Sequence, residues 1–195
     1  MNTQSYKLPE QPELFFNPET HVYLANGMEL PSVTTVLKNV GIVNTRFYTK
    51  AGTEKGTNVH LLLEYLDKDT LDWEEVTDSG LEHIQNWERF KAEYEVKILN
   101  IETPLYHPLI RFAGTIDRFA IVSGLPAVID IKSGAYAKWH ELQITFYAMI
   151  VSYLLNMPVE KYLVYTKKYK VRHVEKNLIP VCEAILRVEK WKREK

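Results

Sequence analysis

Two aspartates, Asp117 and Asp130, flank a tight turn and have the chemistry to share a divalent cation. The dipeptide Ser-Gly at 123–124 lies midway between them. An antiparallel hairpin centred on that dipeptide places the two carboxylates directly opposite one another on one face, with Cβ atoms about 5 Å apart. Carboxylates that close repel each other unless a cation lies between them or one is protonated. Lys132 follows two residues after Asp130 and therefore shares its face.

Burial makes the pair harder to explain without a cation. Asp130 interrupts the apolar run at 127–131, which is typical of a strand buried on both faces, where a bare carboxylate is costly. A salt bridge between Lys132 and one aspartate is the purely structural alternative, and it leaves the second carboxylate unexplained. A turn of odd length would shift the register and separate the pair. From geometry and repulsion we predict a divalent-metal site here.

Three further polar side chains lie at the margins of predicted apolar helix faces. In a helix predicted at 53–66, His60 falls beside the apolar arc, where an imidazole can reach a cleft. In a helix predicted at 139–156, Gln143 falls inside the apolar arc and Tyr147 at its edge, so their tips can meet. The ordinary alternatives are a solvated histidine, a core glutamine bonded to backbone and a tyrosine that packs.

The elements that must position these residues alternate between helix and strand. Asn-Gly at 26–27 predicts a hairpin over 21–30, and Ser32 is a predicted N-cap. Strand signals dominate 99–132 and recur in 159–174. The predicted helices are 33–40, 53–66, 80–98, 139–156 and 178–194. This order predicts an α/β fold with a small mixed sheet, in a single domain over 1–195.

Composition excludes several classes of protein. The chain of 195 residues is 46% hydrophobic and 25% charged, and no apolar run approaches the roughly 20 residues of a membrane span. No secretory signal is visible, so a cytoplasmic location is expected. A single cysteine, Cys182, excludes a disulfide framework, a zinc knuckle and a four-cysteine iron–sulfur cluster. Residues 161–195 carry a net charge of +7 (eleven Lys/Arg, four Glu), against −8 for the remainder.

The ordered motifs resemble the RecB-like branch of the PD-(D/E)XK nuclease superfamily. The Pro-Ser-Val-Thr segment at 31–34 is similar to one in phage and bacterial exonuclease-like members and in the mitochondrial genome maintenance exonuclease. The resemblance covers about residues 15–165. The motifs are Gly56-x3-His60-x3-Glu64, Gly114-Thr-Ile-Asp117, Asp130-Ile-Lys132 and Gln143-x3-Tyr147.

The resemblance implies a restriction-endonuclease-like core, with a mixed central sheet flanked by helices. An N-terminal hairpin and helices (about 12–66) would pack on a catalytic core (about 98–170). Mg²⁺ or Mn²⁺ would be held by Asp117, Asp130, His60 and the backbone carbonyl of Ile131. Lys132 would position or activate the attacking water and offset charge in the transition state.

Further residues are carried over by the same resemblance. Gln143 and Tyr147 are expected near the active site and the nucleic-acid strand. Glu102 and Glu64 are expected behind the metal ligands or against DNA, and Ser32 is expected to contact a DNA phosphate. The aromatic residues that could stack on unpaired bases are Phe47, Tyr48, Trp139 and Tyr147.

The implied function is that of a Mg²⁺- or Mn²⁺-dependent DNA exonuclease acting at free or single-stranded ends. A structure-specific or nicking endonuclease on the same core is an alternative, and a non-catalytic DNA-binding or partner-docking module is another. The chain lacks the four cysteines of the cluster-bearing branch and a P-loop. Hence no iron–sulfur cluster is expected, and a helicase or recombination partner would act in trans. The expected setting is the cytoplasm of a bacterial or phage-infected cell. The basic region 161–195 is a candidate phosphate track, although its charge alone favours the ordinary alternative of a solvated, lysine-rich final helix.

Overall fold

The computed structural model describes residues 6–44 and 49–194. Phe47 and Tyr48, predicted to stack on bases, lie outside the described residues. The strands are β1 (Leu14–Asn17), β2 (Val22–Ala25), β3 (Met28–Leu30), β4 (Lys97–Tyr106), β5 (Ala113–Val122), β6 (Leu125–Lys132), β7 (Glu160–Tyr165) and β8 (Lys170–His173). The helices are α1 (Val33–Asn39), α2 (Lys50–Asp67), the 3-10 turn η2 (Trp73–Glu75), α3 (Asp78–Glu93), α4 (Trp139–Leu155) and α5 (Ile179–Arg193).

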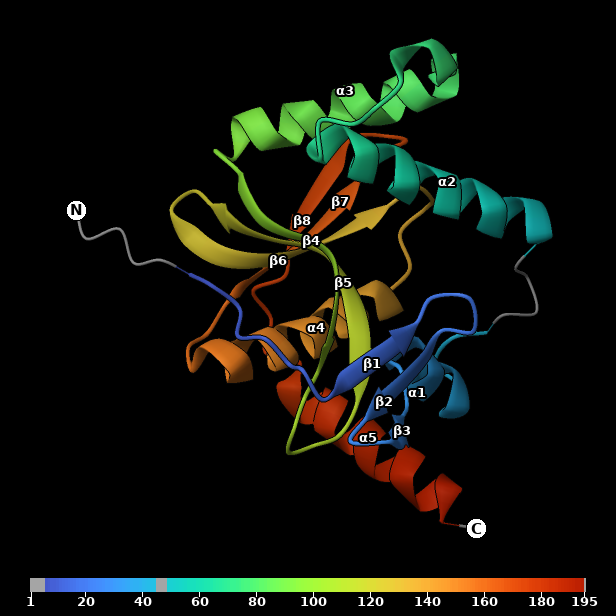
Figure 1. The fold of residues 1–195 in the computed structure, drawn as a ribbon, viewed down its shortest axis with the longest axis vertical. Coiled ribbons are helices and arrows are strands. Elements are labelled where there is room, and N and C mark those ends of the chain that lie inside the picture. Colours follow the sequence, from blue (N-terminus) through green and yellow to red (C-terminus); the bar gives the residue numbers. More distant parts are fainter. Residues whose placement is uncertain (1–5, 45–48, 195) are drawn as a thin grey trace.

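A five-stranded sheet in the order β4-β5-β6-β7-β8 forms the centre of the molecule (Figure 1). Its strand pairs are antiparallel except β6–β7, which are parallel and are joined through α4. Parallel strands need a crossover connection, and the apolar sequence of α4 supplies one that covers the sheet. The prediction of a mixed sheet flanked by helices is confirmed.

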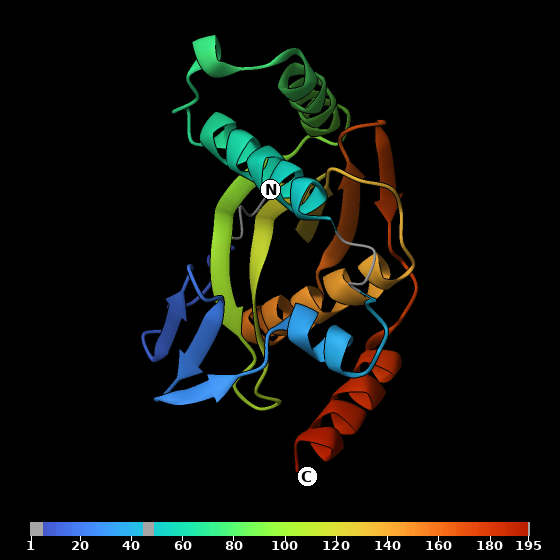
Figure 2. The same ribbon diagram turned by 90° about the vertical axis from the view of Figure 1, so that its right-hand side faces the viewer.

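Helices cover both faces of this sheet (Figure 2). On one face α2 and α3 contribute Val59, Leu63 and Trp87 to a core shared with Ile129 and Ile131 of β6. On the other face α1, α4 and α5 pack against the alternate residues of the same strands. Because β6 is buried on both faces, its sequence is nearly continuous in apolar residues.

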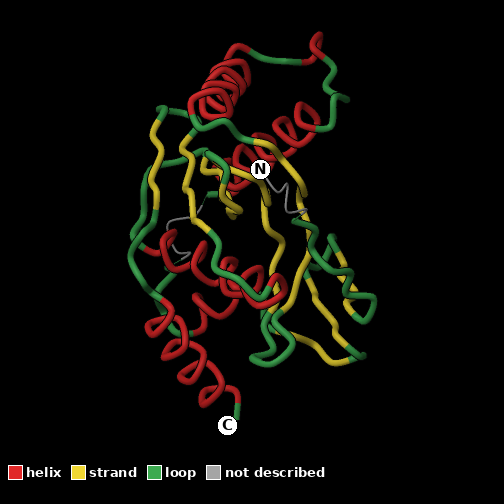
Figure 3. Tube along the Cα trace, turned by 90° about the vertical axis from the view of Figure 1, so that its left-hand side faces the viewer, coloured by secondary structure: helices red, strands yellow, loops and turns green. Residues whose placement is uncertain are grey.

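A separate three-stranded sheet, β1-β2-β3, lies beside the end of β4 and β5 (Figure 3). The predicted hairpin at Asn26-Gly27 is present, and both residues have positive φ. The strand β1 was not predicted. Tyr23 joins this small sheet to β5 through a 2.8 Å hydrogen bond between its hydroxyl and that of Thr115. The single-domain organisation stays a prediction.

Two helix predictions need correction. The helix predicted at 80–98 ends at Glu93, and β4 begins at Lys97, because Glu95 adopts φ of 49° and strand-forming residues follow it. The helix at 139–155 is buried around most of its circumference, since the sheet, α1 and α5 all contact it. None of the helices in the described residues combines the length and the apolar character that a membrane crossing requires.

Candidate active site

The candidate site lies where β5 and β6 stop pairing with each other, after Arg118 and Ile129, and this point is called the fork below. The two strands pair from Val122↔Leu125 to Arg118↔Ile129, which is the register predicted from the Ser-Gly turn. Beyond this point β5 keeps its pairing with β4 as far as Ala113, and β6 keeps its pairing with β7 as far as Lys132. Asp117 and Asp130 are the next residues on the two diverging strands. An oxygen of Asp117, Oδ2, accepts the Ile131 N–H at 2.6 Å, in place of a ladder bond.

A cluster of three potential ligands lies at this fork. His60 Nδ1 on α2 is 3.6 Å from Asp117 Oδ2 and 3.8 Å from Glu102 Oε1 on β4. One ligand atom from each of these residues lies within 4.8 Å of the others. Glu102 was expected behind the ligands, but the structure places it among the candidate ligands. Asp130 is not a member of this group and instead pairs with Lys132.

The backbone of β4 is distorted where Glu102 approaches Asp117. The register of the β4–β5 pair shifts between Ile98 and Asn100, and Glu102 has φ of 40°. A residue other than glycine in this left-handed region costs about 1–3 kcal/mol, so its surroundings must hold it there. Arg118 does so, because its Nη1 donates to Glu102 Oε1 at 3.0 Å.

Burial and charge shift the pKa values of the cluster. Burial alone would lower the pKa of His60, but the carboxylates of Asp117 and Glu102 outweigh it and raise that pKa to about 9. Burial raises the pKa of Asp117, and Glu102 adds to the rise while His60 opposes it. At neutral pH, therefore, His60 is protonated and presents a positive charge to Asp117 and Glu102.

Lys132 is held between the second aspartate and the helix α4. Its Nζ lies 2.6 Å from Asp130 Oδ2 and donates to Gln143 Oε1 at 2.9 Å. Burial raises the pKa of Asp130 to about 6, against the opposing effect of the Lys132 ammonium group. Gln143 Nε2 in turn donates to the Tyr147 hydroxyl at 3.1 Å. Gln143 and Tyr147 therefore contact each other, as their spacing allows, and the salt bridge raised as the structural alternative is present.

Gly114 makes room for Tyr147. A Cβ added at Gly114 would lie 2.6 Å from Tyr147 Cε1 and 3.3 Å from Val33 Cγ2. The ring therefore packs against bare backbone of β5, which explains a glycine three residues before Asp117. At Gly56, by contrast, an added Cβ would meet Ser133 Oγ at an ordinary 3.6 Å.

A buried ionic network anchors α2 above the fork. Asp67 is the last residue of α2, and its side chain is fully buried. Its carboxylate accepts from Arg118 Nε at 2.8 Å, from Trp87 Nε1 at 2.9 Å and from Lys91 Nζ at 2.9 Å. Because Arg118 also binds Glu102, one buried guanidinium joins the helix that carries His60 to the strand that carries Glu102.

A second set of contacts holds the end of β6. The Lys132 carbonyl accepts the Thr166 N–H at 3.0 Å. The Thr166 hydroxyl pairs with His83 Nδ1 at 2.7 Å, and its carbonyl accepts from Asn86 Nδ2 at 2.8 Å. Through these bonds α3 fixes the backbone that carries Lys132.

Hollows open on both sides of the cluster. One of about 580 Å³ is lined by Glu102, Asp117, Glu64 and Ser32. The other, of about 400 Å³, is lined by His60 and Lys132 among others. Ser32 caps α1, as predicted, with its Oγ accepting the Thr35 N–H at 3.1 Å. Glu64 pairs with Lys68 one turn along α2.

A comparison of the sequence with protein-family models identifies the family. The family model of the PD-(D/E)XK nuclease superfamily matches residues 65–191, which is 127 of 195 residues. The chain belongs to this superfamily. No curated protein shows significant similarity to the sequence. Among solved structures, a candidate exonuclease from Eubacterium rectale is 16% identical with a TM-score of 0.45, over 84% of this chain and 75% of that one.

Membership of the PD-(D/E)XK superfamily shows a nuclease of restriction-endonuclease-like fold, with DNA as the substrate class. Nucleases of this superfamily use divalent metals, and the His60–Glu102–Asp117 cluster has the donor atoms to bind one. The matched region contains Glu102, Asp117, Asp130, Lys132, Gln143 and Tyr147, while His60, Glu64 and Ser32 precede it.

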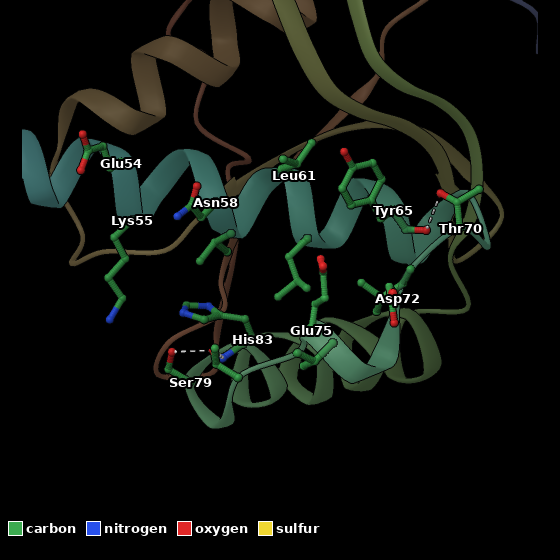
Figure 4. A pocket seen from close by; sticks show the side chains of 16 residues that line it. Glu54, Lys55, Asn58, Leu61, Tyr65, Thr70, Asp72, Glu75, Ser79 and His83 are labelled. Carbon is green, nitrogen blue, oxygen red and sulfur yellow. Dashed lines mark hydrogen bonds between the residues drawn. The ribbon is translucent and has the colours of Figure 1, made fainter.

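Another hollow, of about 730 Å³, lies between α2 and the segment η2–α3 (Figure 4). The residues labelled in Figure 4, such as Asn58, Glu75 and His83, come from these helices and the loop between them. None of the predicted site residues at the fork lines this hollow.

Proposed function

We propose that this protein is a Mg²⁺- or Mn²⁺-dependent DNA exonuclease that hydrolyses phosphodiester bonds at free or single-stranded ends. The observation that carries the proposal is the pairing of two groups at one fork. One is the acid–histidine cluster of Glu102, Asp117 and His60. The other is the ammonium group of Lys132, whose position is fixed from both sides.

The donor set fits a hard divalent cation with some tolerance for nitrogen. Two carboxylates and one imidazole suit Mn²⁺ or Mg²⁺, whereas Zn²⁺ sites in proteins favour cysteine and several histidines. Asp117, Glu102 and His60 supply ligand atoms already close together. Asp130 and the Ile131 carbonyl, on the facing strand, are the further ligands that the family resemblance assigns. The bound ion would lower the pKa of a water molecule and neutralise charge on the scissile phosphate.

In this proposal Lys132 and its neighbours orient the attacking water and stabilise the transition state. Lys132 Nζ, held by Asp130 and Gln143, presents a fixed positive charge that orients the attacking water and stabilises the developing charge on the phosphate. Tyr147 holds Gln143 through its hydroxyl. Because its two partners and Tyr147 behind them are buried, Lys132 needs little reorganisation during the reaction.

Two substitutions test the catalytic assignment. Asp117→Asn and Lys132→Met keep the size of each side chain and remove its charge. Each should lower Mn²⁺-dependent release of nucleotides from end-labelled DNA by at least about 100-fold, the scale on which a preorganised charge acts. Lys97→Met is the matched control, since Lys97 is exposed at the start of β4, opposite Ile121 and away from the fork. Undiminished hydrolysis by both variants would refute the site.

Metal binding by the individual ligands is measured apart from activity. Titration of Mn²⁺ followed by electron paramagnetic resonance should show weaker binding for Asp117→Asn and Glu102→Gln, if the cluster seen here is the ion site. Weaker binding by Asp130→Asn with no change for Glu102→Gln would instead favour the ligand set that the family resemblance implies. Unchanged binding by all three would contradict a metal role for the fork.

Covalently closed single-stranded circles separate the exonuclease from an endonuclease. The preference for ends rests on the likeness of the Pro-Ser-Val-Thr segment at 31–34 to exonuclease-like members, and an exonuclease leaves such circles intact. Cutting of circles would favour a structure-specific or nicking endonuclease. DNA binding in EDTA without turnover in any divalent metal would favour a non-catalytic module. A helicase or recombination partner in trans, and a cytoplasmic location in bacterial or phage-infected cells, stay predictions.

A further inference from the structure

A lysine-rich groove continues from the active site. The hollow that contains His60 and Lys132 shares its floor, Gly52 and the loop 133–135, with a neighbouring groove of about 560 Å³. The loop 133–135 follows β6 directly, so the floor begins where the chain leaves Lys132. A polymer bound at the fork therefore has a continuous surface to follow in this direction.

Every charged residue among the described residues that line this groove is positive. These include four lysines and no acid: Lys55 at the start of α2, and Lys167, Lys168 and Lys170 at the β7–β8 turn. All four are exposed, and none makes an ion pair with another described residue. Such a local charge in a chain of net charge −1 is an electrostatic footprint for a polyanion.

We propose that this groove binds the backbone of single-stranded DNA on one side of the scissile phosphate, with Lys55, Lys167, Lys168 and Lys170 contacting successive phosphates. The inference rests on the proposed function, because the fork must hold the scissile phosphate. It divides the basic region 161–195 into two parts. The β7–β8 turn belongs to the track, whereas the basic residues of α5 line a different hollow.

Tyr136 adds a surface for a base. Its ring lines the groove and is 40% exposed. The guanidinium of Arg172 lies 4.1 Å from the ring centroid, and the Tyr136 hydroxyl donates to Glu141 Oε1 at 2.8 Å. These two contacts fix the ring. An exposed, fixed aromatic ring beside a basic track is the combination with which proteins bind single strands without reading sequence.

The test compares two variants of equal charge. The triple variant Lys167→Ala/Lys168→Ala/Lys170→Ala removes three lysines of the track, and Arg187→Ala/Lys190→Ala/Lys192→Ala removes three exposed cations of α5. Anisotropy of a labelled oligo-dT of about 16 nucleotides in EDTA, over a range of salt, gives the affinity and its salt slope. For the track variant we expect a slope smaller by about 2, from about 0.7 per lost contact, and at least tenfold weaker binding in low salt. The α5 variant should stay within about twofold of the wild type.

Tyr136→Leu separates stacking from charge. It should weaken binding by about fivefold or more while leaving the salt slope unchanged, because stacking releases no counterions. Equal slopes and affinities for the track and α5 variants would overturn the proposal. So would a wild type that does not bind the oligonucleotide.

Hydrolysis of bis(p-nitrophenyl) phosphate in Mn²⁺ tests the nuclease activity of the fork separately from DNA binding by the groove. This small diester fits the fork without reaching the groove, so the track variant should hydrolyse it at the wild-type rate. If every variant hydrolyses the diester and the track variant binds DNA as well as the wild type, the groove is not the DNA-binding track, whereas the proposed nuclease activity stands. If the track variant loses DNA binding but neither it nor the wild type hydrolyses the diester or DNA, the groove binds DNA and the proposed nuclease activity is refuted.

Discussion

Replacing Arg118 by methionine should lower the free energy of unfolding by about 3–5 kcal/mol. The guanidinium is fully buried and joins three elements of the fold. Its Nε donates to Asp67 Oδ2 at 2.8 Å and its Nη1 donates to Glu102 Oε1 at 3.0 Å. Methionine has a similar length and fills the space, so the change removes the charge more than the volume.

The magnitude follows from these two bonds. A hydrogen bond to a charged group contributes about 1.5–3 kcal/mol, so two such bonds contribute about 3–6 kcal/mol. The buried carboxylate of Asp67 keeps its bonds from Trp87 and Lys91, which lessens the loss. The result falls in the range of about 3–5 kcal/mol measured when one partner of a buried ion pair is removed.

Urea denaturation followed by circular dichroism measures the loss. Lys91→Met is the matched control, because Lys91 also binds Asp67 but is 21% exposed and shares its charge with Glu88. It should cost about 1 kcal/mol. A loss for Arg118→Met no larger than that of Lys91→Met would refute the argument. In the double variant Arg118→Met/Asp67→Asn no buried charge is left without its partner, so its loss should be smaller than the sum of the single losses.

Three further predictions concern the same region. Gly114→Ala should cost about 1–3 kcal/mol in urea denaturation, because the new Cβ would lie 2.6 Å from Tyr147, whereas Gly134→Ala should change stability by less than about 0.5 kcal/mol. Burial, with a contribution from the Lys132 charge, lowers the pKa of His140 to about 3, so the unfolded chain binds more protons below pH 6.5 and stability falls as the pH drops. His140→Gln should remove up to about 2 kcal/mol of the fall between pH 7 and pH 5, and an unchanged fall would contradict the burial of a neutral imidazole. Mn²⁺ at about 100 times its Kd should stabilise the protein by about 2.7 kcal/mol, seen as a rise in melting temperature that EDTA reverses; an equal rise in Asp117→Asn would place the ion elsewhere.

The register of the β5–β6 hairpin was predictable because the residues of its turn determine it. Ser123 and Gly124 both adopt positive φ, as a two-residue turn between antiparallel strands requires. From that turn, strict alternation carries the pairing to Arg118↔Ile129, one step before the two aspartates. No local signal in the sequence indicates that the two strands stop pairing with each other at this point.

Helical periodicity predicted the position of three more side chains at the site. His60, Gln143 and Tyr147 lie at or inside apolar helix faces, where a polar group needs a partner. Their partners turned out to be Asp117 for His60, Lys132 for Gln143 and Gln143 for Tyr147. Periodicity gives the direction in which a side chain points, but the identity of the partner depends on which strand lies opposite.

Glu102 was expected behind the metal ligands or against DNA, and Arg118 was not singled out. The positions of both depend on irregular backbone and on contacts between residues far apart in the sequence. The left-handed φ of Glu102 and the register shift before it turn the carboxylate toward Asp117. Asp67 lies 51 positions before Arg118 in the chain. One signal was available, since alternation places an arginine directly after Asp117 on the opposite, apolar face of the sheet, where it must find a buried anion.

The charge balance of the fork explains why Arg118 and His60 are both needed. Two carboxylates within 4.8 Å of each other repel by about 3–4 kcal/mol at an effective dielectric constant near 20. Arg118 offsets this repulsion permanently, because a guanidinium does not lose its proton in proteins. His60 offsets it through a proton that a cation can replace, since its imidazole faces both carboxylates. Arg118 therefore stabilises the geometry of the fork on its own, whereas at the proposed metal site His60 would provide the charge that an incoming ion replaces.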